Sequence, residues 1–173
     1  MMDWGSLGAG VLRWAHVFVG IMWIGLLYFF NFVNADAAKA ANAAGEGAPI
    51  GKYIMPPALF YFRWAALFTW LVGAGLLSML PPQNGMNGFL AAFALQGVDA
   101  PIGIGAWLGT IMFVNVWTFI WMNQKKILGF VPATDEEKVK ARRVAFLASR
   151  VNTMLSIPML FFMVTGPHQS IYH

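Results

Sequence analysis

Two histidines are the residues of this sequence best suited to holding a redox cofactor. His16 lies in the apolar segment nearest the N-terminus, and His168 follows the apolar segment nearest the C-terminus. An imidazole inside a membrane is costly unless it pairs or ligates. A haem b iron accepts two axial nitrogens, so one histidine from each of two helices at the same level of a bundle would suit it. The pattern predicts His16 and His168 as ligands of a haem b iron.

Two neighbours of His16 fit the same interpretation. Gly20 lies one turn along the same helix face, where a glycine leaves room for a flat macrocycle. Arg13 lies one turn in the other direction and is placed to pair with a haem propionate. The alternative is that His16 hydrogen-bonds a neighbouring helix and that His168 is an ordinary loop residue.

Two arginines form a second candidate group. Arg63 and Arg150 each lie about six residues inside an apolar segment, which corresponds to about 9 Å of helix. Asn152 lies at a similar depth and Asn115 lies deeper, while no Asp or Glu occurs inside these segments. One interpretation is a cationic, polar pocket for an anion: a substrate, a quinone head group or propionates. The alternative is that the long arginine side chains extend to lipid phosphates.

The elements that must position these residues are apolar segments of membrane-spanning length. They cover residues 9–33, 58–80, 102–122 and 144–165. Each is long enough for a helix to cross a hydrocarbon core of about 30 Å. The fourth helix is expected to begin earlier, at residue 135, because Thr134 and Glu137 form the S/T-x-x-E capping pattern.

The composition indicates that these helices lie in lipid. The chain is 59% hydrophobic and only 10% charged, whereas soluble domains have about 25% charged residues. Such a chain cannot cover a soluble surface with polar groups. We therefore predict an all-α fold: a four-transmembrane-helix bundle that forms a single integral membrane domain over residues 1–173.

Lysine and arginine predict the orientation of the bundle. Eight of them lie in the first and third connections and the start of the fourth helix: Lys39, Lys52, Lys125, Lys126, Lys138, Lys140, Arg142 and Arg143. The opposite side has only Arg13. The positive-inside rule places the eight in the cytoplasm. We expect a multi-pass protein of the bacterial inner membrane with both termini on the periplasmic side.

Composition also excludes several kinds of site. The absence of cysteine excludes disulfides, cysteine-ligated zinc, iron–sulfur clusters and covalent attachment of a c-type haem. The net charge of +4 does not indicate nucleic-acid binding, because the charges lie in loops and no basic face alternates with exposed aromatic residues.

Several stretches of the chain have a pattern longer than chance would give. They are Arg13-Trp14-Ala15-His16-Val17 with Gly20 and Trp23-Ile24-Gly25; Thr69-Trp70-Leu71-Val72-Gly73; Trp107-Leu108-Gly109-Thr110 with Asn115-Val116-Trp117 and Gln124-Lys125-Lys126; and Ser149-Arg150-Val151-Asn152-Thr153 with Pro158-Met159-Leu160-Phe161-Phe162-Met163. These stretches resemble the membrane domain of the membrane-bound bacterial urate oxidase (urate hydroxylase) family. The first helix is also distantly similar to small four-helix haem-binding membrane proteins.

The resemblance implies a redox role that depends on partners. Full-length members of that family join a membrane domain to a C-terminal cytochrome c, oxidise urate and pass electrons to that haem. The present sequence has no C-x-x-C-H motif and only four predicted spans. The resemblance therefore implies a short four-helix form without the cytochrome c domain.

Three functional hypotheses follow from the residues and the resemblance together. The first is a membrane electron-transfer subunit that holds haem b and works with a c-type cytochrome or a larger respiratory-type complex. The second is an enzyme, a urate-like purine oxidoreductase that binds its anion at Arg63, Arg150, Asn152 and Asn115 and depends on partner proteins. The third is a cofactor-free accessory subunit of a membrane complex.

Overall fold

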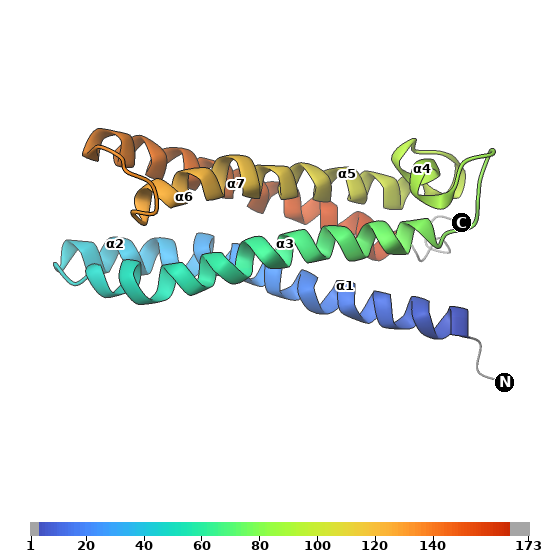
Figure 1. Ribbon diagram of the computed structural model, residues 1–173, viewed down its shortest axis with the longest axis horizontal. Coiled ribbons are helices and arrows are strands. Elements are labelled where there is room, and N and C mark those ends of the chain that lie inside the picture. Colours follow the sequence, from blue (N-terminus) through green and yellow to red (C-terminus); the bar gives the residue numbers. More distant parts are fainter. Residues whose placement is uncertain (1–3, 167–173) are drawn as a thin grey trace.

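The computed structural model describes residues 4–166, and this part of the chain is helical (Figure 1). Four helical stretches of this part are long and apolar enough to cross a membrane: Leu7–Ala43, Ile50–Ser78, Gly97–Ile127 and Asp135–Thr165. The predicted fold class, an all-α bundle of four transmembrane helices, is confirmed. The chain is a multi-pass membrane protein by the length and composition of these helices.

The individual elements are shorter than these spans because several are joined end to end. They are α1 (Trp4–Tyr28), α2 (Ala35–Ala43), α3 (Met55–Ser78), α4 (Gly88–Phe93), α5 (Ala100–Asn115), α6 (Trp121–Ile127) and α7 (Asp135–Thr165). Three π-helical segments, Phe29–Asn34, Ile50–Ile54 and Val116–Ile120, link α1 to α2, lead into α3 and link α5 to α6. A single turn of 3-10 helix, Gly97–Asp99, precedes α5.

The first helical span continues well beyond the expected end at residue 33. After Tyr28 the backbone widens to the π form and then runs on as α2 to Ala43. The physical reason is local, because the stretch 35–44 is rich in alanine, the best helix former, and contains no proline. The third span likewise extends past residue 122 to Ile127, whereas α7 has the bounds expected from the sequence.

The helices pack as two antiparallel pairs, α1 with α3 and α5 with α7 (Figure 1). The pairs meet in a core whose most buried members come from α1, α3, α5 and the π-helical segment after α5: Trp23, Leu27, Phe62, Ala66, Met112 and Val116. Glycine permits the close approach of α5 to α7, since a Cβ on Gly105 would lie 3.3 Å from Cβ of Phe162. This core holds α1 and α7 at the fixed distance on which the polar contacts described below depend.

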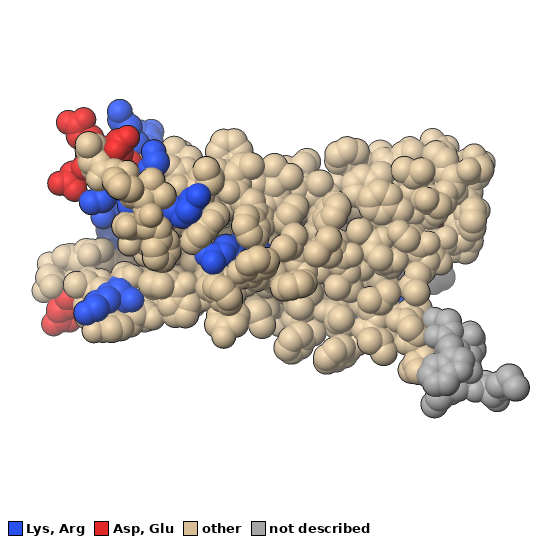
Figure 2. All heavy atoms as spheres, viewed as in Figure 1, with Lys and Arg blue, Asp and Glu red and all other residues tan. Residues whose placement is uncertain are grey.

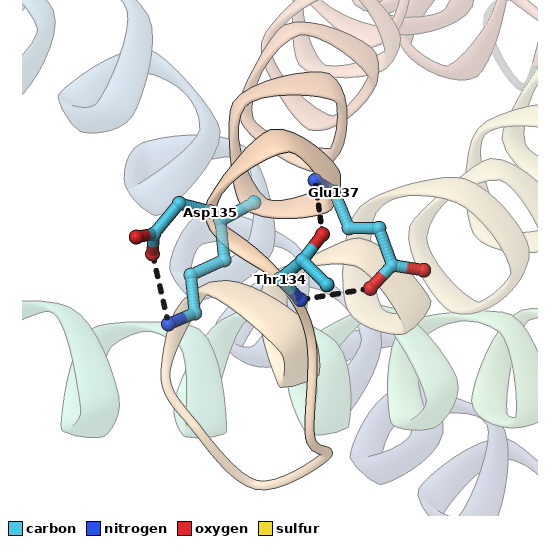
Figure 3. Close-up of polar contacts among 4 residues, drawn as sticks. Thr134, Asp135 and Glu137 are labelled. Carbon is cyan, nitrogen blue, oxygen red and sulfur yellow. Dashed lines mark hydrogen bonds and ion pairs between the residues drawn. The ribbon is translucent and has the colours of Figure 1, made fainter.

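The charged residues visible in Figure 2 gather at the end formed by α2, α6 and the start of α7. The start of α7 is fixed by a capping box (Figure 3). The backbone N–H of Glu137 donates to Oγ1 of Thr134 at 3.2 Å, and the N–H of Thr134 donates to Oε2 of Glu137 at 2.8 Å. Lys138 and Asp135 form an ion pair one turn apart, 3.6 Å between Nζ and Oδ1. The capping pattern predicted from Thr134 and Glu137 is present.

Candidate functional site

His16 is half-buried on α1 and faces α3. Its Nδ1 lies 3.0 Å from the backbone carbonyl oxygen of Thr69. A carbonyl only accepts, so Nδ1 carries the hydrogen, and in the neutral ring Nε2 keeps its lone pair free. Metal-bound histidines usually have this arrangement, with the non-ligating nitrogen donating to a carbonyl or carboxylate. The contact also matches the alternative interpretation, a hydrogen bond from His16 to a neighbouring helix.

Gly73 makes room for the imidazole against α3. A Cβ added at Gly73 would lie 2.9 Å from Cε1 and 3.2 Å from Nδ1 of His16, closer than side chains normally approach. The ring therefore rests on the backbone of α3 at a position where only glycine fits without a shift. Sequence reasoning gave Gly73 no role at the site, although it stands one turn after Thr69 in the helix that the ring contacts.

Gly20 and Arg13, the other predicted haem-site residues that the structure describes, have different surroundings from His16. Gly20 faces α3, where its missing Cβ would be in ordinary contact with Cγ2 of Thr69 at 3.8 Å. A larger residue would therefore also fit here, and Gly20 is half-buried. Arg13 is exposed near the start of α1. His168 lies outside the described residues, so its pairing with His16 stays a prediction.

Arg63 is half-buried and lies among aromatic rings at the other end of the bundle. Its guanidinium carbon is 3.8 Å from the ring centroid of Trp121 on α6 and 5.2 Å from that of Phe60. Trp117, one turn before Trp121, packs edge-on against Trp64 at 5.7 Å. The indole N–H of Trp117 is buried and has no hydrogen-bond partner among the described residues. We call Arg63, Trp64, Trp117 and Trp121 the Arg63 cluster.

The Arg63 cluster combines a guanidinium with flat aromatic faces. A guanidinium stacked on an indole is held by a cation–π contact, and its N–H groups stay free to donate at the ring edges. A planar ligand with carbonyl oxygens or negative charge has the complementary chemistry. The cluster could not be predicted from the sequence, because Trp117 and Trp121 lie more than fifty positions from Arg63 and look like ordinary interfacial tryptophans.

Asn115 and Asn152 are brought together, but they bind each other. Nδ2 of Asn115 donates to Oδ1 of Asn152 at 2.7 Å and to the carbonyl of Ala148 at 2.9 Å. Nδ2 of Asn152, which is fully buried, donates to the carbonyl of Met112 at 3.0 Å. These contacts clamp α5 to α7. The two amides therefore have partners within the bundle itself.

Arg150 is separated from these asparagines by the body of α7. It is exposed, and its guanidinium carbon lies 5.1 Å from the ring centroid of Phe146 on the same helix. Asn152 is two positions further along, which turns it about 200° around the helix, toward the buried side. The structure thus brings Asn115 to Asn152 but places Arg150 on the outer surface and Arg63 in an aromatic cluster.

Polar contacts between α1 and α7 form a second group that the sequence did not reveal. Asn31, buried in the first π-helical segment, donates to Oγ of Ser149 at 2.7 Å and to the carbonyl of Leu27 at 2.8 Å. The hydroxyl of Tyr28 lies 2.9 Å from Oγ of Ser156. Ser156 donates to a carbonyl of its own helix, so Tyr28 is the donor in that pair. The presence of Asn31 inside an apolar segment was the one feature of the sequence that indicated this group of contacts.

Two of the three π-helical segments contain or follow one of the asparagines that contact α7. Asn31 lies within the first, and Asn115 immediately precedes the third. Both side chains contact α7, at Ser149 and at Ala148 and Asn152. π-Helical turns in α-helices are frequently found at functional sites. The two widened turns direct the side-chain amides of Asn31 and Asn115, which come from different helices, toward one stretch of α7.

Comparison with known families gives one result. The family model described as urate oxidase N-terminal matches residues 84–173, just over half of the chain. The matched range includes α4, α5, α6 and α7, with Asn115, Arg150 and Asn152. His16 and Arg63 lie before it. No curated protein and no solved structure matches the chain. The resemblance predicted from the sequence is confirmed, and the chain belongs to the urate oxidase N-terminal family.

Proposed function

We propose that this chain is a urate-oxidase-like membrane subunit that holds haem b through His16 and exchanges electrons with a c-type cytochrome. The observation that carries the proposal is the hydrogen bond from Nδ1 of His16 to the Thr69 carbonyl. It leaves Nε2 as the free, basic nitrogen of a half-buried imidazole inside a membrane span. Membership of the urate oxidase N-terminal family supports a redox role.

The fit of the residues to a haem differs from one position to the next. His16 has the donor chemistry, and Thr69 and Gly73 hold its ring in one orientation. Gly20 faces Thr69 of α3, whose Cγ2 would be in ordinary contact with a Cβ at 3.8 Å. Arg13 is exposed and free to meet a propionate. A bound haem would supply one-electron chemistry, and the protein's own part is to fix the imidazole and its hydrogen.

The test is the visible spectrum of the gently extracted protein. The wild type should show the absorbance of a b-type haem, and His16→Ala should abolish it. His168→Ala should leave a five-coordinate, high-spin haem, since His16 remains. His173→Ala is the matched control and should leave the spectrum unchanged. A colourless wild type, or a normal spectrum in His16→Ala, refutes haem ligation and favours the cofactor-free accessory subunit.

The second candidate is a purine-like oxidoreductase that binds its anion at the Arg63 cluster. Two observations favour this site: the guanidinium of Arg63 stacked on Trp121, and the buried, unpaired indole N–H of Trp117. Urate is planar and carries carbonyl oxygens and negative charge, so it matches both. Turnover of urate with added cytochrome c should fall at least tenfold in Arg63→Gln, because a charge-assisted contact is lost. Normal turnover in that variant would exclude this site.

We also propose that the charged end faces the cytoplasm. Most lysines and arginines lie at that end, and the positive-inside rule relates such a bias to the cytoplasmic side. The c-type cytochrome would then meet the opposite end, in the periplasm of a bacterium, on the side where α1 carries His16. With this orientation, the membrane we propose is the bacterial inner membrane.

A further inference from the structure

One face of α7 combines exposed apolar residues with two arginines. At 100° per residue, Arg143, Phe146, Arg150, Met154 and Ile157 share one side of the helix. Phe146, Met154 and Ile157 are 47%, 72% and 67% exposed, and both arginines are exposed. Five of the buried residues of α7 point the opposite way: Ala141, Ala145, Asn152, Ser156 and Met159; a sixth, Thr153, borders the exposed face. Arg150 therefore projects away from the bundle and into the surrounding lipid.

The depth of Arg150 makes its charge expensive. It lies seven positions beyond Arg143, about 10 Å further along the helix. The residues around it on this face are apolar. An unpaired guanidinium among the acyl chains costs at least about 2.5 kcal/mol when it lies at the membrane centre. This cost falls when the side chain reaches a polar group near the interface.

The protein itself supplies no counter-charge at this level. α1, α3 and α5 contain no Asp or Glu, and α7 has them only in its first turn. The last of these, Glu137, is thirteen positions from Arg150, about 20 Å along the helix. Among the described residues Arg150 forms no ion pair. A second copy of the chain in the same orientation would bring no carboxylate from these helices either.

Arg63 contrasts with Arg150 and shows that the exposure is specific. Arg63 lies at a comparable depth, but Trp121 and Phe60 cover its guanidinium and the residue is half-buried. Arg150 has only the ring of Phe146, on its own helix, at 5.1 Å, and it is exposed, so it is the more open of these two arginines to neutralisation from outside the protein. The group available in a bilayer at the charged end is the phosphate of a phospholipid, drawn inward from the interface.

We propose that the exposed face of α7 binds the phosphate of an anionic phospholipid between Arg150 and Arg143. Arg150 contacts the phosphate from below and Arg143 contacts it from the interface, while Phe146 and Met154 lie against the acyl chains. The two arginines lie on one side of one helix, so a single head group can meet both. Two positive charges favour a lipid with net negative charge, such as phosphatidylglycerol, over phosphatidylcholine.

The test measures lipid selectivity in bilayers. The purified protein is reconstituted in phosphatidylcholine, and the motionally restricted fraction of spin-labelled phosphatidylglycerol is compared with that of spin-labelled phosphatidylcholine. The wild type should prefer phosphatidylglycerol. Arg150→Gln should lower this preference about fivefold, the effect expected for one basic residue at a membrane surface. Arg150→Lys should keep most of it, because the charge remains.

Two controls are needed. One distinguishes a lipid site at Arg150 from general attraction by any arginine at this depth, and the other distinguishes it from a site for free phosphate. Arg63→Gln removes an arginine of similar depth that rings already cover, and it should leave the preference unchanged. Millimolar inorganic phosphate should not compete, since the site opens to acyl chains. The proposal is overturned by a wild type without preference, by an unchanged Arg150→Gln, by an equal loss in Arg63→Gln, or by competition from inorganic phosphate. If Arg150→Gln does not fold, the wild-type preference, Arg150→Lys and the phosphate competition still decide the question.

Discussion

Replacing Asn152 by alanine should weaken the contact between α5 and α7. Asn152 is fully buried and joins the two helices through two hydrogen bonds, one accepted from Asn115 at 2.7 Å and one donated to the Met112 carbonyl at 3.0 Å. Alanine removes both. Asn115 keeps its second bond, to the carbonyl of Ala148, so it is not left wholly without partners.

The magnitude follows from these contacts. Hydrogen bonds between membrane helices contribute about 0.6 kcal/mol on average, so two of them amount to about 1.2 kcal/mol. The lost amide also leaves a small void in a site that is fully enclosed, which adds about 1 kcal/mol. We expect Asn152→Ala to lower the free energy of unfolding by about 2 kcal/mol. The double variant with Asn115→Ala should show a coupling of about 0.6 kcal/mol.

The assay is unfolding of the purified protein in mixed micelles by titration with sodium dodecyl sulfate, followed by circular dichroism. Asn123→Ala is the matched control. Asn123 is partly exposed, and its Nδ2 donates to Phe119 of its own helix at 2.7 Å, so its loss should change stability by less than about 0.5 kcal/mol. If Asn152→Ala and Asn123→Ala unfold at the same detergent fraction, the two asparagines do not clamp the helices as argued.

Three further predictions concern other parts of the chain. Gly73→Ala should cost about 1–3 kcal/mol in the same titration, because its Cβ would press on the ring of His16 at 2.9 Å; an unchanged midpoint would show that the ring does not rest there. Thr134→Ala should cost about 1 kcal/mol through loss of the capping box and speed hydrogen exchange in the first turn of α7; unaltered exchange would contradict the role of the cap. Reporter fusions after Pro82 and after Ala133 should report opposite sides of the membrane, and the same side for both would refute the arrangement of four spans.

The polar contacts join α7 to both the first and the third spans. Asn31 and Tyr28 bind it from the first span, and Asn115 binds it from the third. The family match covers α7 completely, together with α5. The His16 contact, by contrast, joins α1 to α3, outside the matched range. The His16→Ala variant therefore probes a part of the chain that the family match does not cover, whereas His168→Ala lies within it.

The sequence alone determined the number of spans and the start of α7. The length of each apolar segment can be read locally, because the thickness of the bilayer sets it. The capping box is also local, because it needs only two residues three positions apart. The ends of the first and third spans were wrong by several residues. Hydropathy falls at the membrane surface, whereas an alanine-rich helix continues into water wherever its backbone hydrogen bonds are satisfied.

Only the tertiary structure decided which way each candidate residue faces. In water a buried helix face is recognisable because it is the apolar one, but in lipid the outward face is as apolar as the core. The sequence therefore placed Arg63, Arg150 and Asn152 at similar depths, with Asn115 deeper, but did not show which way each side chain faces. Packing then paired the asparagines, covered Arg63 with tryptophan and left Arg150 exposed. It likewise directed His16 to the Thr69 carbonyl, a backbone atom that no side-chain pattern could reveal.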